Sequence, residues 1–137
     1  MNDITRAYFA GLFDGEGSVS IVKRLDPRYR ADFGLLLRIS IWNVDRGVLQ
    51  EAVGLFGGSI STHKPRGLSK KTLYCWQLYG MNAQRFLSAI LPYTRIARRK
   101  VRTALRYPIR RGGTGLTAQA MKRQTAIRER ISSLNQK

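Results

Sequence analysis

Two carboxylates alternate with two glycines in the stretch Asp14-Gly15-Glu16-Gly17. The preceding residues predict a helix over 3–15, so both carboxylates stand where that helix ends. Carboxylates are unfavourable there, because the macrodipole is negative and the last carbonyls lack partners. A hard divalent cation would remove the conflict by binding carboxylate and carbonyl oxygens together. An ordinary helix end with solvated acids is the alternative that these residues leave open.

Basic residues give the chain a second chemical signal. Its 25 Lys and Arg outnumber 8 Asp and Glu, for a net charge of +17. Residues 1–94 hold 12 basic and 7 acidic residues, whereas residues 95–137 hold 13 basic and 1 acidic residue. In the second part, Arg98, Arg102 and Arg106 recur at a spacing of four and form one helical stripe. Such a charge predicts a polyanionic partner, most commonly nucleic acid. A solubilising tail is the alternative, but the excess is mostly arginine, which pairs well with phosphate.

The composition excludes several classes of site and protein. With a single cysteine, Cys75, the chain cannot form an intramolecular disulfide. With a single histidine, His63, it has no zinc site built from Cys and His and no obvious histidine-based triad. No apolar stretch approaches the roughly 20 residues of a membrane span, and no secretory signal is visible at the N-terminus. We therefore expect an intracellular protein without a membrane partner, and the compartment stays open between bacterial or phage-infected cytoplasm and an organelle.

Hydrophobic periodicity predicts one α+β domain over 1–137, whose basic C-terminal helices occupy 95–137. The expected order is helix, hairpin, helix, hairpin and further helices (αββαββα), with an antiparallel sheet. Helices are expected over 3–15, 46–56, 83–91, 95–107 and 117–134, and strands over 18–25, 33–42, 59–64 and 72–79. Helix N-caps are expected at Asn2 or Asp3, at Asp45 and at Asn82.

The stretch from Phe9 to Gly17 resembles the LAGLIDADG motif of homing endonucleases. Phe9 and Phe13 are apolar replacements within the motif, and Glu16 replaces its second aspartate. The residues that match the motif directly are Ala10, Gly11, Leu12, Asp14, Gly15 and Gly17. The stretches 41–45 and 91–93 also look like recurrent family positions. The family's single-motif members have the element order that we predict here.

This resemblance implies a homodimer, because in the family two motif helices pack side by side through small residues. The corresponding contacts here are Ala7, Ala10, Gly11 and Asp14, and Asp14 is also expected to have a structural role. One motif per chain then gives one catalytic site per subunit, and each site cleaves one strand.

The same resemblance assigns the catalytic residues. Glu16 is expected to bind Mg²⁺ with the Gly15 carbonyl beside it, and Mn²⁺ is expected to substitute. Asn43 matches a position that orders water near the metal. Ala97 stands where the family often has a lysine, and its neighbours Arg95 and Arg98 could supply the missing charge, with Arg98 expected to be the catalytic residue. This departure concerns the rate of cleavage and leaves DNA binding untouched.

By the same resemblance, the antiparallel sheet is saddle-shaped, and one of its faces lies on the major groove of double-stranded DNA. The residues expected to face the DNA there are Ser20, Val22, Arg24, Arg28, Arg38, Ser40, Trp42, Ser61, His63 and Gln77. Those expected to hold phosphate are Lys64, Arg66, Lys70 and Lys71. Packing is an equally good interpretation of Val22 and Trp42. In the strand over 72–79, Cys75 is expected to be buried, and the expected core residues are Tyr74, Trp76 and Leu78.

The sequence therefore predicts a site-specific homing endonuclease, intron-encoded or intein-associated, that cleaves both DNA strands by metal-dependent phosphodiester hydrolysis. The first alternative is the same fold used only for binding, as an intron RNA maturase or a non-cleaving DNA-binding regulator. Host intron RNA would be the partner of such a maturase. The second alternative is a small basic RNA-binding protein of the ribosomal kind, with neither a dimer nor a metal.

Overall fold

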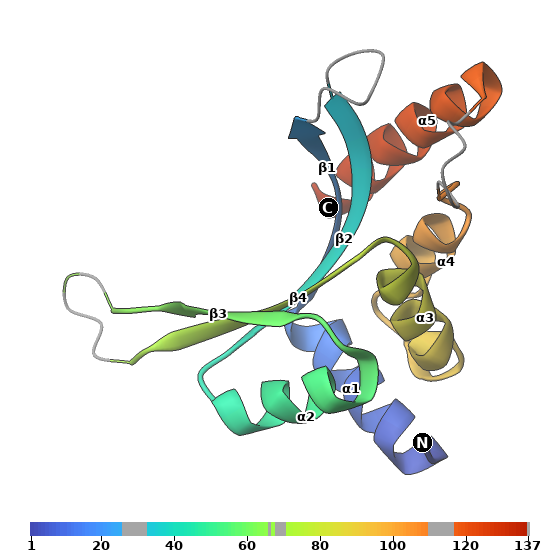
Figure 1. The fold of residues 1–137 in the computed structure, drawn as a ribbon. Helices are drawn as coiled ribbons and strands as arrows, with labels where there is room; N and C mark the ends of the chain where they lie inside the picture. The colour runs from blue at the N-terminus through green and yellow to red at the C-terminus, as the bar shows by residue number, and fades with distance from the viewer. Residues whose placement is uncertain (26–32, 66, 68–70, 110–116, 137) are drawn as a thin grey trace.

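The computed structural model describes residues 1–25, 33–65, 67, 71–109 and 117–136 (Figure 1). Within these residues, helices pack against a single antiparallel sheet of four strands. The helices are α1 (Asp3–Glu16), α2 (Arg46–Phe56), α3 (Gly80–Ile90), α4 (Arg98–Leu105) and α5 (Ala118–Asn135), with a short 3-10 helix η1 (Leu91–Tyr93). The strands are β1 (Gly17–Leu25), β2 (Phe33–Asn43), β3 (Ser59–His63) and β4 (Leu73–Tyr79). The expected α+β class and element order are confirmed.

Helix α1 begins and ends close to where its sequence predicts. Asn2 caps it, because the Asn2 Oδ1 accepts a hydrogen bond from the Thr5 N–H at 2.8 Å. Gly17 follows the helix in an extended conformation, and its N–H donates to the Phe13 carbonyl. A Cβ at position 17 would overlap the Phe13 ring, so this position requires glycine. The chain passes directly from α1 into β1, which puts Glu16 at their junction.

The two hairpins join into one sheet with the strand order β1-β2-β4-β3. Ser40 of β2 pairs with Ser18 of β1 on one side and with Gln77 of β4 on the other. Gln77 also pairs with Ser59 of β3, so one row of residues crosses all four strands. Alternate residues of neighbouring strands therefore share a face. In Figure 1 the β1–β2 and β3–β4 hairpins diverge as two arms, which gives the sheet the expected saddle shape.

The helices cover the apolar face of this sheet (Figure 1). The buried residues on that face are Val19, Ile21, Leu37, Ile39, Ile41, Trp76 and Leu78. An aromatic cluster joins the sheet to the helices. The centroid of the Phe86 ring in α3 lies 5.1 Å from the ring centroid of Trp76 and 5.7 Å from that of Phe13. In the described part of the chain, no helix has both the length and the apolar character that a bilayer crossing requires.

Helix α3 departs from the sequence prediction at its start. It begins at Gly80, so Asn82 lies inside the helix and the prediction of an Asn82 cap is wrong. Gly80 has a φ of 58°, which lets the chain turn from β4 into the helix without a linker. In β4 itself Cys75 is buried as expected, whereas Tyr74 is only half-buried.

Helix α4 also starts later than predicted, at Arg98 in place of residue 95. The backbone at Thr94 is extended, with φ −71° and ψ 145°, and this interrupts the helix between η1 and α4. Ala97 is the N-cap residue of α4 and has no side-chain cap of its own. The start of α4 is therefore fixed by a contact from elsewhere in the chain.

Candidate nucleic-acid interface and catalytic motif

Asp14 provides that contact by joining the end of α1 to the segment before α4. Its Oδ2 accepts a hydrogen bond from the Arg95 N–H at 2.8 Å, and its Oδ1 accepts one from the Ala97 N–H at 2.9 Å. The carboxylate thereby caps α4 and lies at the positive end of that helix's dipole. This compensates for its unfavourable place at the end of α1. Asp14 has the structural role that we expected, and a contact between Asp14 and a second copy stays a prediction.

Glu16, unlike Asp14, has no partner among the residues that the structure describes. It is the last residue of α1, its side chain is exposed, and it forms no hydrogen bond or ion pair with any described residue. A Cβ on Gly15 would meet nothing within 4 Å, so the backbone at this helix end is open to a ligand. A free carboxylate beside the last carbonyls of a helix fits a hard divalent cation. In the described ranges, no three His, Cys, Asp or Glu side chains gather closely enough to hold a metal by themselves.

A cavity of about 310 Å³ lies beside the Asp14 contact. Its lining includes Ser18 at the start of β1, Ala97, and two cationic residues of α4, Arg99 and Lys100. Lys100 follows Ala97 by about one helical turn. The structure therefore places Arg99 and Lys100 beside the motif, where the sequence analysis expected Arg98.

One side of α1 exposes small and apolar residues. Ile4 is 81% exposed and Tyr8 is 54% exposed. Ala7 is also exposed, and a Cβ on Gly11 would meet nothing within 4 Å. Ala10 lies on the opposite side of the helix and is fully buried in the core of its own chain. The prediction that Ala10 contacts a second copy is therefore wrong, because residues 4, 7, 8 and 11 form the exposed side.

The sheet face opposite the helices carries the residues that we expected to meet DNA. The strand register puts on this one face Ser20, Val22, Arg24, Arg38, Ser40, Trp42, Ser61, His63 and Gln77. At its centre the Ser18 and Ser40 hydroxyls are hydrogen-bonded at 2.7 Å. The predicted set thus forms a continuous polar face of the sheet.

Two side chains that could read bases are held by their neighbours on this polar face. The Arg38 Nε donates to the Ser20 hydroxyl at 3.3 Å, and the Tyr79 hydroxyl donates to the Gln77 Oε1 at 2.9 Å. Tyr79 was missing from the predicted set, although the alternation of strand residues places it two positions from Gln77 on the same face.

The Trp42 and His63 rings pack together near the far end of the polar face, with centroids 4.6 Å apart. His63 is also hydrogen-bonded to the Ser61 hydroxyl at 3.0 Å. Trp42 is half-buried, so packing accounts for part of its surface. Cys75 pairs with both Trp42 and Ser61 and is fully buried, and this burial raises the pKa of its thiol. The Cys75 thiol is therefore uncharged at neutral pH.

Asn43 ends β2 and begins the turn into α2. Its Oδ1 accepts the Asp45 N–H at 2.8 Å, and the Asp45 Oδ1 caps α2 by accepting the Val48 N–H at 3.3 Å. The Asp45 cap is confirmed. Because the Asn43 Oδ1 is engaged, a water-ordering role for Asn43 would fall to its Nδ2.

The basic side chains predicted at the strand ends are only partly described. Lys64 and Lys71 are exposed near the ends of the β3–β4 arm. The predicted contacts that lie outside the described residues are Arg28, Arg66 and Lys70.

Known proteins are similar to this chain in structure, although none matches it in the sequence comparisons. No protein-family model and no curated protein matches the chain by sequence. The homing endonuclease I-CvuI, solved with the I-CreI target in the presence of Mg, aligns with a TM-score of 0.73 and 15% identity, over 96% of this chain and 82% of I-CvuI. The archaeal intron-encoded homing endonuclease I-Vdi141I, complexed with DNA, aligns with a TM-score of 0.68 and 18% identity, over 96% of this chain and 84% of I-Vdi141I. The chain has the LAGLIDADG homing endonuclease fold.

A third LAGLIDADG fold differs from this chain in length. The meganuclease I-SmaMI, bound to uncleaveable DNA, aligns with a TM-score of 0.59 and 14% identity. The alignment covers 96% of this chain and 42% of I-SmaMI. This chain therefore corresponds to less than half of that protein. At these identities the comparison supports the fold, and the assignment of site residues rests on the geometry described above.

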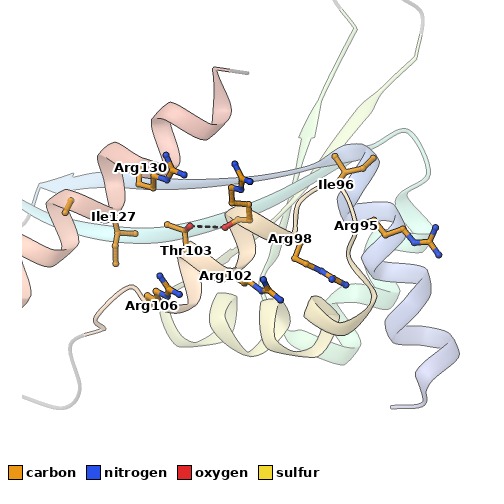
Figure 2. Close-up of a pocket in the computed structure, with 10 residues that line it drawn as sticks. Arg95, Ile96, Arg98, Arg102, Thr103, Arg106, Ile127 and Arg130 are labelled. Atoms are coloured by element: carbon orange, nitrogen blue, oxygen red, sulfur yellow. Dashed lines mark hydrogen bonds between the residues drawn. The ribbon is translucent and has the colours of Figure 1, made fainter.

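A second basic surface lies among the helices of this fold. Between α4 and α5 is a groove of about 780 Å³, shown in Figure 2, whose lining also includes Thr103 and Ile127. Its cationic residues are Arg95, Arg98, Arg99, Arg102, Arg106 and Arg130. The spacing of Arg98, Arg102 and Arg106 predicts their stripe, but no local signal indicates that Arg130 lines the same groove. Arg98, expected at the motif, lines this groove instead, and its Nε donates to the Thr94 carbonyl at 3.1 Å.

Proposed function

We propose that the chain is a site-specific DNA endonuclease that acts as a homodimer and cleaves both strands by metal-dependent hydrolysis. The observation that carries this proposal is the position of Glu16. This carboxylate, which pairs with no described residue, stands where α1 passes into β1, and β1 carries the polar face from Ser18 onward. A duplex on that face would bring phosphate close to the motif. The similar proteins I-CvuI and I-Vdi141I are homing endonucleases solved with DNA.

The polar face suits the major groove of double-stranded DNA. Arg38 can pair bidentately with guanine, and Gln77 can pair with adenine. Both side chains are already held by neighbours, Ser20 and Tyr79, which reduces the conformational entropy lost on binding. Lys64 is exposed on the β3–β4 arm and would contact phosphate.

A second copy of the chain would cover the exposed side of α1. Ile4 and Tyr8 expose apolar surface there, and Ile96, in the segment before α4, is 81% exposed. Burial of such surface favours association, and Gly11 allows the two helix backbones to approach closely. I-SmaMI, of which this chain covers 42%, is long enough to hold two such units in one chain. A homodimer would supply two units from separate chains.

Mg²⁺ is the cofactor that the motif suits best, with Mn²⁺ as a substitute. Glu16 and the Gly15 carbonyl of each copy would hold it, together with phosphate oxygens of the DNA. A metal held there would stabilise charge on the scissile phosphate and activate water. The second copy and the DNA would complete the ligand set, since Glu16 is the one free acid at this point among the described residues of a single chain. I-CvuI was solved with Mg and with Ca.

Lys100 is our candidate for the cationic group beside the scissile phosphate. It lines the cavity next to Ala97 and Ser18, together with Arg99. Its ammonium group would stabilise negative charge on the phosphate or the leaving oxygen. Asp14 keeps this part of α4 in place, because it fixes the residue at which α4 begins.

Cleavage selection from a randomised library of DNA sites, with Mg²⁺ or Mn²⁺, tests the proposed function. The wild-type chain is expected to select one class of site. Glu16→Gln keeps the side-chain shape and removes the charge, so cleavage should fall by several orders of magnitude while DNA binding in EDTA is retained. Glu51→Gln is the matched control, because Glu51 is an exposed carboxylate on α2. Cleavage by Glu16→Gln at the wild-type rate would show that the mechanism is wrong.

A binding-only function is the alternative, and the alanine at position 97 is the observation that favours it. A chain that binds nucleic acid tightly but cleaves no site in the library would be a maturase or a regulator with this fold.

A further inference from the structure

Hydrogen bonds hold both ends of the Gln77 side-chain amide on the polar face. The Tyr79 hydroxyl donates to its Oε1 at 2.9 Å, and its Nε2 donates to the Cys75 Sγ at 3.6 Å. The three residues occupy alternate positions of β4, so they share one face of the sheet. Tyr79 is 39% exposed, Gln77 is half-buried and Cys75 is fully buried. The row therefore runs from the surface of the sheet to a buried sulfur atom.

The buried thiol determines which way the Gln77 amide faces. A neutral thiol has one hydrogen to donate and a sulfur atom that accepts weakly. Burial raises the pKa of Cys75, so the thiol keeps its hydrogen, which it donates to the Trp76 carbonyl at 3.9 Å. The sulfur is left as an acceptor, and only the NH₂ end of the amide can donate to it. The Oε1 end consequently faces Tyr79, whose hydroxyl donates to it.

This orientation leaves Gln77 with one donor and one acceptor for a ligand. The amide has two N–H groups and two lone pairs, of which its bonds to described residues use one each. In the major groove, adenine presents an acceptor at N7 and a donor at N6, which match the two groups that remain. Guanine presents acceptors at both N7 and O6, so Oε1 would face another acceptor. An amide that was free to turn over could offer N–H to guanine as well, and it would discriminate less.

We infer that Cys75 and Tyr79 are positioning residues that fix the Gln77 amide and thereby set a preference for adenine over guanine at one base pair. Neither residue needs to touch the base, because both act through Gln77. The inference rests on the proposed function, since it takes the polar face as the surface that meets the major groove. The catalytic motif and the cleavage step do not enter it, so DNA binding alone can test it.

The experiment measures base preference by binding in EDTA. The wild-type chain first selects its site from a randomised duplex library, and Gln77→Ala then identifies the base pair that Gln77 reads. At that base pair, competition between duplexes should show that wild type prefers adenine to guanine by roughly 5-fold to 150-fold. Tyr79→Phe removes only the hydroxyl, and Cys75→Val removes only the acceptor. Each should lower the ratio by about 5-fold, the equivalent of one hydrogen bond, and only at that base pair.

Three controls separate positioning from a general effect on structure. Tyr74→Phe removes a hydroxyl from the face of β4 that packs against the core, so it should leave every ratio unchanged. Cys75→Ser keeps an acceptor beside Nε2 and should retain the preference for adenine. In a Gln77→Ala background, Tyr79→Phe should have no further effect at the same base pair, because its effect passes through Gln77.

The results distinguish this inference from the proposed function. A wild-type chain that selects no site would refute site-specific DNA binding, and the inference with it. If selection succeeds, the inference alone is overturned when wild type shows no preference for adenine at the Gln77 base pair. It is also overturned when Tyr79→Phe leaves that preference unchanged, or still alters it without Gln77.

Two further results would also contradict the positioning roles. Tyr79 pairs with Arg38 across β4 and β2, so a change confined to the base pair that Arg38→Ala identifies would show that Tyr79 acts on Arg38 instead. A Cys75→Ser variant that loses the preference as fully as Cys75→Val would show that Cys75 acts through packing. Melting curves confirm that each variant is folded, and Cys75→Ala replaces Cys75→Val if the larger side chain prevents folding.

Discussion

Replacing Asp14 with asparagine tests the contact that joins α1 to the start of α4. The carboxylate accepts backbone hydrogen bonds at 2.8 Å from Arg95 and at 2.9 Å from Ala97. Asparagine keeps one acceptor but presents an NH₂ group to the other N–H, so one backbone donor loses its partner. The loss of a hydrogen bond to a charged group costs about 1.5–3 kcal/mol. The change in dipole interaction at the end of α1 is offset by the opposite change at the start of α4.

The expected loss of unfolding free energy is therefore about 2–3 kcal/mol. For a domain of this size, Tm falls by about 3–5 °C for each kcal/mol of unfolding free energy lost, so the expected fall in Tm is roughly 6–15 °C. Circular dichroism melting curves measure it. Glu16→Gln is the matched control, because it removes the same charge from the same helix without removing a described hydrogen bond, and its Tm should hold or rise. An Asp14→Asn variant that melts at or above the wild-type temperature would refute the capping role.

The remaining predictions concern the dimer, base reading, the catalytic cation and the buried thiol. Gly11→Leu should give a monomer or an aggregate by light scattering, because the added side chain holds the two α1 helices apart, and an unchanged dimer would contradict the interface. Arg38→Ala should cost about 1–3 kcal/mol and relax the preference at one base pair in a site selection, whereas Lys64→Ala should weaken all sites alike. Lys100→Met should lower the rate of plasmid cleavage at saturating DNA more than Arg98→Met does. A larger loss in Arg98→Met would instead identify Arg98 as the cationic group beside the scissile phosphate. Burial raises the pKa of the Cys75 thiol, so a thiol reagent at pH 8 should label the folded chain far more slowly than the chain in urea.

Local signals were sufficient for most elements of the fold. The Asn2 and Asp45 caps, the alternation along β2 and the glycine after α1 are each determined by a few neighbouring residues. The start of α4 could not be predicted this way, because it depends on Asp14, more than eighty positions away. The start of α3 was misplaced because Asn82 looks like a cap, while the positive φ of Gly80 starts the helix earlier.

The sequence predicts the position of a candidate site residue where the pattern of apolar and polar residues determines its face. It does not predict the position where this depends on how a helix is oriented in the fold. Strand alternation puts Arg38 and Gln77 each opposite the apolar row of its own strand, so both side chains are on the face away from the helices. In α1, small residues occur on both sides of the helix, so composition could not show that Ala10 is in the core while Gly11 is exposed. The groove between α4 and α5 depends on how two helices meet, and the sequence holds no signal for the position of Arg130.

The two carboxylates at the end of α1 have separate roles, and this division explains why the motif carries both. Two uncompensated acids there would each oppose the helix dipole. Asp14 is compensated inside the chain by the N–H groups at the start of α4, so it needs no cation. Glu16 has no such partner among the described residues, so the need for positive charge is confined to one exposed position. Because the same Asp14 contact sets where α4 begins, it also positions Lys100 beside the motif. Asp14→Asn and Glu16→Gln should therefore have different effects. The first should loosen the part of the fold that positions Lys100, and the second should remove the charge that we propose holds the metal.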